Sequence, residues 1–278
     1  MRSVKSLIVA GAASLFCTAV VAADMPISPP PEYTPPPPSS SDFNGWYLRG
    51  DVGVSNQTIK DLRSTNAALY TPLLSFDQTS SVNSGGIFDL GVGYQFNNWI
   101  RGDVTAQYRG KTNFFATDLF TFPNAGLVGS GVDTYTGTKS EWLFLANGYV
   151  DLGTWWNVTP FIGAGIGTSQ VTISNFVDTN TPVGGVNVAG SASKWNFAWA
   201  GHAGLAYKLS PSATLELAYS YVDLGRGVTG NSHNFNAPLS PYVFEVKNIT
   251  SNDLKLGVRW NLEAPAPVYA PPPLITKG

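Results

Sequence analysis

Apolar and polar residues alternate along most of the chain between Asn44 and Leu262. In the segment GWYLRGDVGVS, Trp46 and Leu48 fall on one side, and Tyr47 and Arg49 fall on the other. Alternation with a period of two is typical of β-strands with one apolar face, because successive side chains point to opposite faces. The pattern predicts eight strands, at residues 45–55, 87–96, 100–109, 141–152, 159–169, 195–209, 214–221 and 253–262.

The connections between these strands alternate in length. Short turns (Asn97-Asn98, GTWWNV and SPSA) alternate with stretches of about 20 to 30 residues that are rich in Ser, Thr, Asn and Gly. A strand of about ten residues, tilted, is long enough to cross a bilayer, and outer-membrane barrels combine short periplasmic turns with long outer loops. A soluble sandwich has no reason to alternate its loop lengths. We predict an all-β fold, an eight-stranded antiparallel up-and-down transmembrane β-barrel with short periplasmic turns and long extracellular loops.

Charged residues keep to one face of the predicted strands. A lysine or arginine facing lipid costs about 2–4 kcal/mol at the bilayer midplane, so the apolar face is predicted to meet lipid. Leu143 and Leu145 are apolar exceptions on the inner face. The predicted polar network of the barrel lumen consists of Arg49, Asp51, Asp89, Arg101, Asp103, Arg109, Glu141, Asp151, His202, Lys208, Glu216, Asp253, Lys255 and Arg259.

An eight-stranded barrel has an interior that side chains just fill. The network is therefore expected to form a structural plug, with the lining of an open channel as the alternative. Tryptophan prefers the headgroup region of a membrane, and it recurs near both ends of the predicted strands. The predicted aromatic girdles consist of Trp46, Trp99, Trp142, Trp155, Trp156, Trp195 and Trp260.

The segment TPFIGAGIGTS contains glycines at positions 163, 165 and 167, a spacing that invites comparison with a phosphate-binding loop. Such a loop follows a strand and opens a helix, whereas these glycines alternate inside one strand and no helical pattern follows. We expect them to make room in the lumen for long side chains of neighbouring strands, and we expect no nucleotide binding.

Both ends of the chain differ in composition from the predicted barrel (44–262). Residues 1–23 have a basic start, a short apolar run and a small-residue end, which predicts a signal peptide cleaved before Asp24. Proline-rich segments follow the signal (24–43, a periplasmic linker) and the barrel (263–278, a C-terminal tail). Cys17, the single cysteine, is expected to leave with the signal.

Charge and residue content exclude several classes of function. Without Arg2 and Lys5, 14 basic residues stand against 18 acidic ones, a net charge of −4 that argues against a nucleic-acid partner. The chain after residue 23 contains no apolar run of 18 residues, which excludes a helical membrane protein. Two histidines and no remaining cysteine make a metal-ligand cluster improbable, and we expect no metal and no cofactor.

Four segments resemble a known family: ANGYVDLGTWWNVTPFIGAGIG, LGVGYQF, TLELAYSYVDLG and LKLGVRWNL. They are similar to the small porin-like outer-membrane surface antigens of alphaproteobacteria, which are distantly similar to the OmpA and opacity-protein barrels. The resemblance covers residues 44–262 and is most specific in the hairpin 149–167. It implies an abundant protein of the Gram-negative outer membrane that supports the envelope and meets host or environment through its loops. Some relatives bind haem.

Three other functions compete with this one. Lipid A deacylases are eight-stranded barrels with a histidine and a serine on the lipid face, but His202 points inward by parity, where we expect it to form hydrogen bonds. His233 is expected to be solvated. A pore for ions or small solutes is the second alternative, and a haem- or ligand-binding surface receptor is the third. Six aromatic residues of the predicted loops are candidates for packing over the mouth, entering lipopolysaccharide or contacting a ligand: Phe114, Phe115, Phe120, Phe122, Tyr242 and Phe244.

The sequence therefore predicts a non-enzymatic outer-membrane barrel. Its expected partners are outer-membrane lipids and lipopolysaccharide, the barrel-assembly machinery during insertion, and a host or environmental ligand at the loops.

Overall fold

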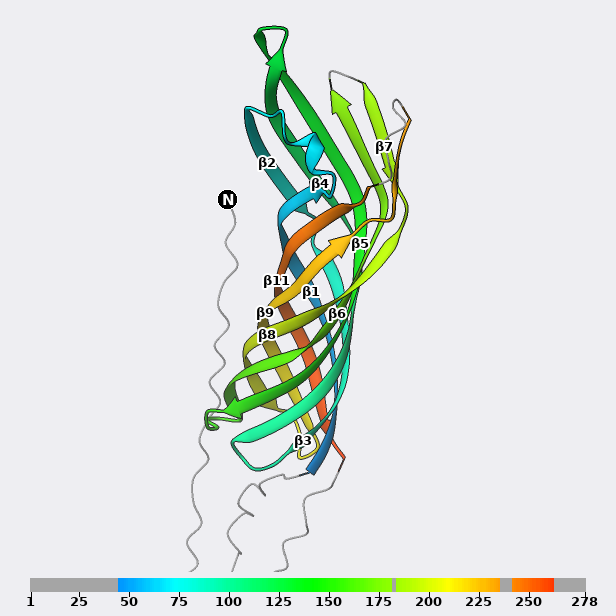
Figure 1. Ribbon diagram of the computed structural model, residues 1–278. Coiled ribbons are helices and arrows are strands. Elements are labelled where there is room, and N and C mark those ends of the chain that lie inside the picture. Colours follow the sequence, from blue (N-terminus) through cyan, green and yellow to red (C-terminus); the bar gives the residue numbers. More distant parts are fainter. Residues whose placement is uncertain (1–44, 182–183, 236–241, 263–278) are drawn as a thin grey trace, which may run out of the picture. The chain divides into compact units, whose positions relative to one another are not determined.

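The computed structural model describes residues 45–181, 184–235 and 242–262. Asn44, the predicted signal peptide (1–23), the linker (24–43) and the C-terminal tail (263–278) lie outside the described residues. The described part contains eleven strands and one short 3₁₀ helix, η1 (Figure 1). The elements are β1 (Gly45–Ser64), η1 (Ala67–Leu69), β2 (Ser75–Val82), β3 (Gly85–Gln95), β4 (Ile100–Asn124), β5 (Leu127–Asp151), β6 (Val158–Thr181), β7 (Gly185–Ala189), β8 (Ala192–Lys208), β9 (Ala213–Val228), β10 (Ser232–Asn234) and β11 (Phe244–Asn261).

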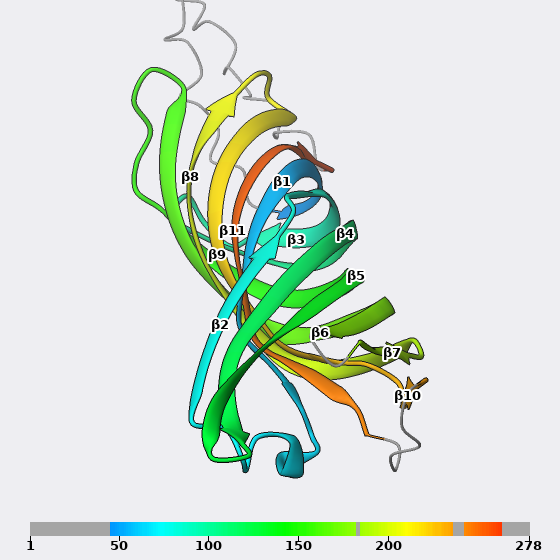
Figure 2. The ribbon, with the colours of Figure 1, turned by 90° about the horizontal axis from the view of Figure 1, so that it is seen from above.

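Eight of these strands close into a ring. Antiparallel pairing runs from β1 through β3, β4, β5, β6, β8, β9 and β11 and returns to β1 (Figure 2). Each strand of the ring contains one of the eight segments in which the sequence alternates. The prediction of an eight-stranded antiparallel barrel is therefore confirmed. Among the described residues, no helix is both long enough and apolar enough to cross a membrane.

The strands are longer than the predicted ten residues, because much of each predicted long loop is paired strand. β4 and β5 have 25 residues each and form one hairpin, drawn in green in Figure 1, that turns at Ala125 and Gly126. Thr and Ser are frequent in these segments, and β-branched threonine is well suited to a strand. The polar composition was a poor sign of loop structure here.

Three short strands widen the sheet beyond the ring. β2 pairs with the distal half of β4, and β7 pairs with the distal part of β6 and with β10. We call the described residues of 57–82, 112–138, 174–191 and 226–249 the extracellular extension, since they lie on the side of the long connections. They continue the barrel wall as a paired sheet.

β-Bulges separate the extension from the barrel. The pairing register shifts between Arg109 and Thr112 in β4, and between Val246 and Thr250 in β11. Asn175 and Asn248 have positive φ angles of 52°, and Gly225 has one of 80°. Each bulge adds a residue and therefore changes which residues point inward. In β4 the buried residues are odd-numbered up to Arg109 and even-numbered from Thr112.

The interior contains a charged part and an apolar part. Charged and polar side chains fill the half near the short turns, as described below. An apolar cluster includes Leu143 and Leu145, which lie on β5 between Asn147 and the Glu141–Lys139 ion pair, and continues into the extension. Phe176 packs on Phe244 there, with ring centroids 4.6 Å apart. The extension therefore has a hydrophobic core of its own.

Candidate functional site

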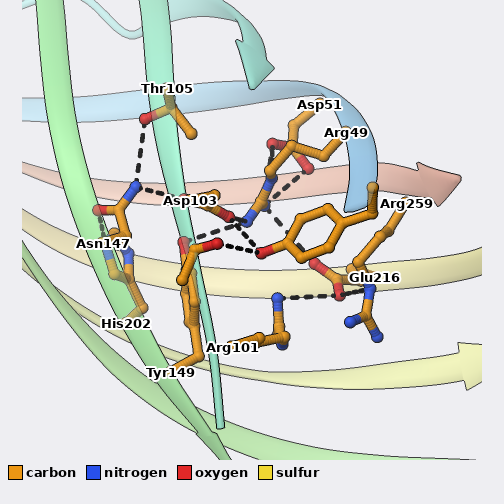
Figure 3. Close-up of polar contacts among 12 residues, drawn as sticks. Arg49, Asp51, Arg101, Asp103, Thr105, Asn147, Tyr149, His202, Glu216 and Arg259 are labelled. Atoms are coloured by element: carbon orange, nitrogen blue, oxygen red, sulfur yellow. Dashed lines mark hydrogen bonds and ion pairs between the residues drawn. The ribbon is translucent and has the colours of Figure 1, made fainter. Parts of the chain in front are cut away.

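Three arginines converge on one carboxylate in the barrel lumen. Glu216, on β9, is 1% exposed. Its Oε1 lies 3.1 Å from Nε of Arg259 and 3.4 Å from Nη1 of Arg101, and its Oε2 lies 3.6 Å from Nη2 of Arg49 (Figure 3). These side chains come from β1, β4, β9 and β11. One acidic residue therefore ties together four strands of the ring.

Arg49 extends this cluster towards β4 and β5. It donates hydrogen bonds of 3.0 Å to Asp51 and Asp103. Asp103 in turn accepts a 2.8 Å hydrogen bond from Nδ2 of Asn147. His202 continues the chain, with Nε2 at 3.2 Å from Oδ1 of Asn147. The lumen thus contains a continuous hydrogen-bonded network from β1 across to β8 (Figure 3).

The remaining predicted lumen residues form smaller ion pairs. Arg101 donates to Asp151 at 3.2 Å, and Lys255 donates to Asp89 at 3.1 Å. A third pair joins Arg109 to Asp253. Glu141 pairs with a residue that the sequence analysis did not select, Lys139 on the same strand.

Lys208 differs from the other residues predicted for the lumen network. The other thirteen are buried, whereas Lys208 is exposed at the end of β8. It lines a cavity of about 600 Å³ at the short-turn end and forms no ion pair with any described residue. Lys208 has the inward parity of the network, but the strand ends at that position, so its ammonium group lies in the periplasmic mouth.

The sequence analysis missed several residues of the network, because they are uncharged or, like Lys139, precede the predicted strand 141–152. The guanidinium carbon of Arg101 lies 4.3 Å from the centroid of the Tyr149 ring. The hydroxyl group of Tyr149 accepts a hydrogen bond from Arg49. Asn147 and Lys139 are two further members on the same strand. All three share the odd parity of Glu141 along β5, which was the signal available in the sequence.

This arrangement is suited to holding a barrel closed. A buried charge without a partner is strongly destabilising, whereas a paired and hydrogen-bonded one is tolerated. Each predicted lumen carboxylate has a cationic partner within the described structure. The network therefore couples strands that are far apart in sequence.

The seven tryptophans predicted for the girdles are all exposed. Trp46 and Trp260 lie at the short-turn ends of β1 and β11, and Trp99 lies in the β3–β4 turn. Trp155 and Trp156 lie in the β5–β6 turn. At the other level, Trp142 and Trp195 flank the same residue, Gln170, in the register of β6 with its two neighbours.

An exposed apolar belt lies between these two levels of tryptophan. Across five neighbouring strands it includes Leu205, Leu217, Leu256, Val52 and Phe88, each opposite the next in the register. Such a belt, bounded by aromatic residues, matches the lipid-facing surface of a transmembrane barrel.

The glycines of β6 lie against side chains of β5 on the lumen side. A side chain at Gly163 would collide with the ring of Tyr149, and one at Gly165 would collide with the carboxamide of Asn147. Both glycines are inside β6, which continues as a strand to Thr181. The local structure is therefore not that of a phosphate-binding loop.

The candidate aromatic residues of the predicted loops lie in the extension. Phe114 and Phe244 are buried in its core. Phe115 is exposed on the outer face, while Phe120, Phe122 and Tyr242 line a cavity described below. His233 is exposed on β10. The tip of the β4–β5 hairpin exposes Leu127 and Val128, at 77% and 68%.

Comparison with known proteins agrees with this architecture. The chain matches the model of the outer membrane protein beta-barrel domain over residues 9–261. It is 28% identical over 232 residues to the outer membrane protein PagN of Salmonella typhimurium, covering 78% of this chain and 89% of that protein. An uncharacterized protein of Brucella suis biovar 1 is 31% identical over 200 residues, with 66% and 69% covered. A Rickettsia prowazekii protein described as a candidate adhesin is 25% identical over 224 residues, with 79% and 88% covered.

Solved structures with similar chains include two small outer-membrane proteins. OprG of Pseudomonas aeruginosa has a TM-score of 0.45 and 14% identity, and covers 79% of this chain and 97% of its own. Neisserial surface protein A has a TM-score of 0.42 and 16% identity, with 78% and 97% covered. The family match spans nearly all of the described barrel, including the lumen network and both tryptophan levels. The chain belongs to the outer membrane protein beta-barrel family and is a protein of the Gram-negative outer membrane.

Proposed function

We propose that this protein is a non-enzymatic outer-membrane barrel that supports the envelope and makes surface contacts through its extracellular extension. The observation that carries the proposal is the extension itself. β4, β5 and β6 continue past the bulges as a paired sheet with a buried aromatic core. A loop that only closed a barrel would not need such a core.

The names of two relatives support a role at the surface. One is called an outer membrane protein and another is described as a candidate adhesin, and both align over more than three quarters of this chain. The exposed Leu127 and Val128 lie next to the turn at the hairpin tip, are its outermost large apolar residues and provide a contact surface. Lipopolysaccharide around the belt and a host or environmental ligand at the tip are the partners we propose.

The position of His202 supports the absence of catalysis. Its Nδ1 lies 2.8 Å from Oγ of Ser220, a spacing that also occurs in hydrolases. Ser220 is fully buried in the lumen and does not face lipid. An acyl chain in the membrane therefore has no path to that hydroxyl group, which supports a structural role for the pair.

Surface display tests the adhesion proposal. The protein is expressed in a non-adherent Escherichia coli strain, and attachment to epithelial cells is counted. The variant Leu127→Ser with Val128→Ser is expected to lose most of the attachment, while Leu74→Ser, an exposed apolar residue elsewhere in the extension, keeps it. Heat-modifiable gel mobility checks that each variant is folded. Equal attachment by wild type and empty cells would refute the proposal.

A pore is the alternative function, and the cavity at the periplasmic mouth is the observation in its favour. The ion-paired layer above that cavity favours a closed barrel. Planar-bilayer conductance distinguishes the two, since a closed barrel gives no discrete channel events.

A further inference from the structure

A second cavity, of about 370 Å³, lies inside the extracellular extension. Its apolar wall is made by aromatic rings from the η1 region, β2, β4 and β11 and the residues next to them. The rings are those of Tyr70, Phe76, Phe120, Phe122, Tyr242 and Phe244. A volume of this size suits a small organic molecule.

Two aspartates line this cavity, and a third lies next to them in the sheet. Asp133 and Asp178 line it directly. Asp118 lies opposite Asp133 in the β4–β5 register, 1% exposed, and accepts hydrogen bonds from Gln78 at 2.6 Å and Tyr135 at 3.0 Å. The cavity therefore combines an aromatic wall with a concentrated negative charge.

The charge of these aspartates is not balanced by the described protein. None of the three forms an ion pair within the described residues, whereas every predicted lumen carboxylate has a cationic partner. Arg63 is the cation whose charge acts on Asp118. It is held by Asp61 at 2.9 Å, and its guanidinium lies over the ring of Phe76. A buried negative charge without a partner is costly, so the cavity is electrostatically suited to a cation.

Unpaired hydrogen-bond acceptors point to the same kind of ligand. Among the residues that line the cavity, Asp178 and Asn180 each have a buried Oδ1 that accepts no hydrogen bond. Asn187 is 3% exposed, lies opposite Asp178 in the β6–β7 register, and donates from Nδ2 to the hydroxyl of Tyr242 at 2.8 Å. Buried acceptors without donors are rare in folded proteins. A ligand rich in hydrogen-bond donors would supply these missing partners.

We propose that this cavity binds a small aliphatic polyamine. Its ammonium groups would donate to Asp133, Asp178 and Oδ1 of Asn180, and its methylene chain would pack on the aromatic wall. Ammonium groups carry only donors and are attracted to the faces of aromatic rings. A hydrated divalent metal ion would match the carboxylates but not the rings. This site lies within the extension and does not depend on the hairpin tip proposed for adhesion.

Proton release is expected to accompany binding. Burial raises the pKa of Asp118 to about 6 and that of Asp178 to about 7, and it also raises the pKa of Asp133. The other titratable groups that face the cluster are Tyr70, Tyr135, Tyr242 and Arg63, and none of them titrates near neutral pH. The empty site therefore holds protons that a cation displaces, and binding is tighter at pH 8 than at pH 6.

Calorimetry with spermidine tests the proposal. The protein is refolded from inclusion bodies into detergent, so that no lipopolysaccharide is present to bind the polyamine. We expect saturable binding at pH 8 that is at least tenfold weaker at pH 6, with a heat that varies with the ionisation enthalpy of the buffer. 1,8-Octanediol, which has no charge, is expected not to bind.

Matched variants locate the site. Asp133→Asn and Asp178→Asn should each weaken binding at least tenfold, and Asp77→Asn should leave it unchanged, since Asp77 is exposed on β2 outside this cavity. The adhesion variant at Leu127 and Val128 should bind normally. Absence of binding by wild-type protein at millimolar spermidine would overturn the proposal, whether or not the variants fold. Equal weakening by Asp77→Asn, or displacement of spermidine by micromolar Ca²⁺, would also overturn it.

Discussion

Asn147 on β5 lies directly opposite Gly165 on β6, and its carboxamide occupies the space that a side chain at position 165 would need. Replacing Gly165 by leucine should therefore overpack the lumen and lower the free energy of unfolding by about 1–3 kcal/mol. Ala164→Leu, one residue away on the exposed face, should change it little because lipid yields. Thermal unfolding of both variants in one detergent provides the comparison.

The same pair of variants tests the assignment of the faces of β6. A larger loss of stability in Ala164→Leu than in Gly165→Leu would show that position 164, and not position 165, faces the lumen. A nucleotide titration completes the test, and neither wild type nor Gly165→Leu is expected to bind ATP.

Glu216 is predicted to be the most sensitive carboxylate of the lumen. Glu216→Gln removes the charge that three arginines share, and breaking a buried ion pair typically costs about 3–5 kcal/mol. Asp61→Asn breaks the exposed pair with Arg63 and should cost at most about 1 kcal/mol. Urea unfolding of the refolded barrels measures both. Similar losses for the two would argue against a structural role of the network.

Leu217 occupies the middle of the exposed apolar belt, between Leu205 and Leu256. Leu217→Arg places a charge in hydrocarbon and should lower stability by about 2–4 kcal/mol, with reduced assembly in cells. Leu217→Phe keeps the surface apolar and should assemble normally. The boiled and unboiled gel mobilities of membrane fractions report the yields, and equal yields would mean that the belt does not face lipid.

The aspartates of the extension should make its stability depend on pH. The pKa of Asp178 in the folded protein, about 7, lies above the ordinary value for aspartate, roughly 3.9. Between these values the folded state binds more protons than the unfolded state, so stability falls as pH rises from about 4 to 7 and then levels off. Hydrogen exchange of the β4–β5 hairpin, corrected for its intrinsic pH dependence, should show faster opening at pH 7.5 than at pH 5. Asp178→Asn should weaken this pH dependence. If the pH dependence of exchange were the same in the variant and the wild type, Asp178 would not be its source.

The backbone conformation at Asn248 is predicted to limit which residues this position accepts. It is exposed, with a φ of 52°, and a left-handed conformation costs a residue other than glycine or asparagine roughly 1–2 kcal/mol. Asn248→Val should therefore destabilise by about that amount, whereas Asn248→Gly should be tolerated. Thr250→Val, two residues further along β11, is the matched control and should have little effect on the melting temperature.

The sequence predicted the ring well because one physical constraint acts on all eight strands. Because lipid excludes charge from one face, the alternation correctly predicts that Leu48 and Leu217 face outward and that Arg49 and Glu216 face inward. The end of β8 shows the limit of this reasoning. Lys208 has the right parity, but parity carries no information about where a strand leaves the lumen.

The extension was predicted less well, for two reasons. Outside lipid both faces of a strand accept polar residues, so Thr and Ser segments of β4 and β5 resembled loops. The bulges also change the parity, which places Phe114 inside and Phe115 outside. Extrapolating the alternation of residues 100–109 would have given the opposite assignment. The aspartate cluster joins β4, β5 and β6 across such shifts, and single-strand patterns could not bring Asp118, Asp133 and Asp178 together.

The bulges between barrel and extension have a consequence for how such proteins diversify. Because each bulge sets the inside and outside of the distal segment afresh, a change of length beyond it does not reorient Arg109 or Asp253 below it. The two halves can therefore change separately, without disturbing each other's inward-facing residues. The distal half is thus a separable part of the fold. Its segments, joined to another eight-stranded barrel at the positions of Gly110, Asn175, Gly225 and Asn248, should keep their paired structure and their surface properties.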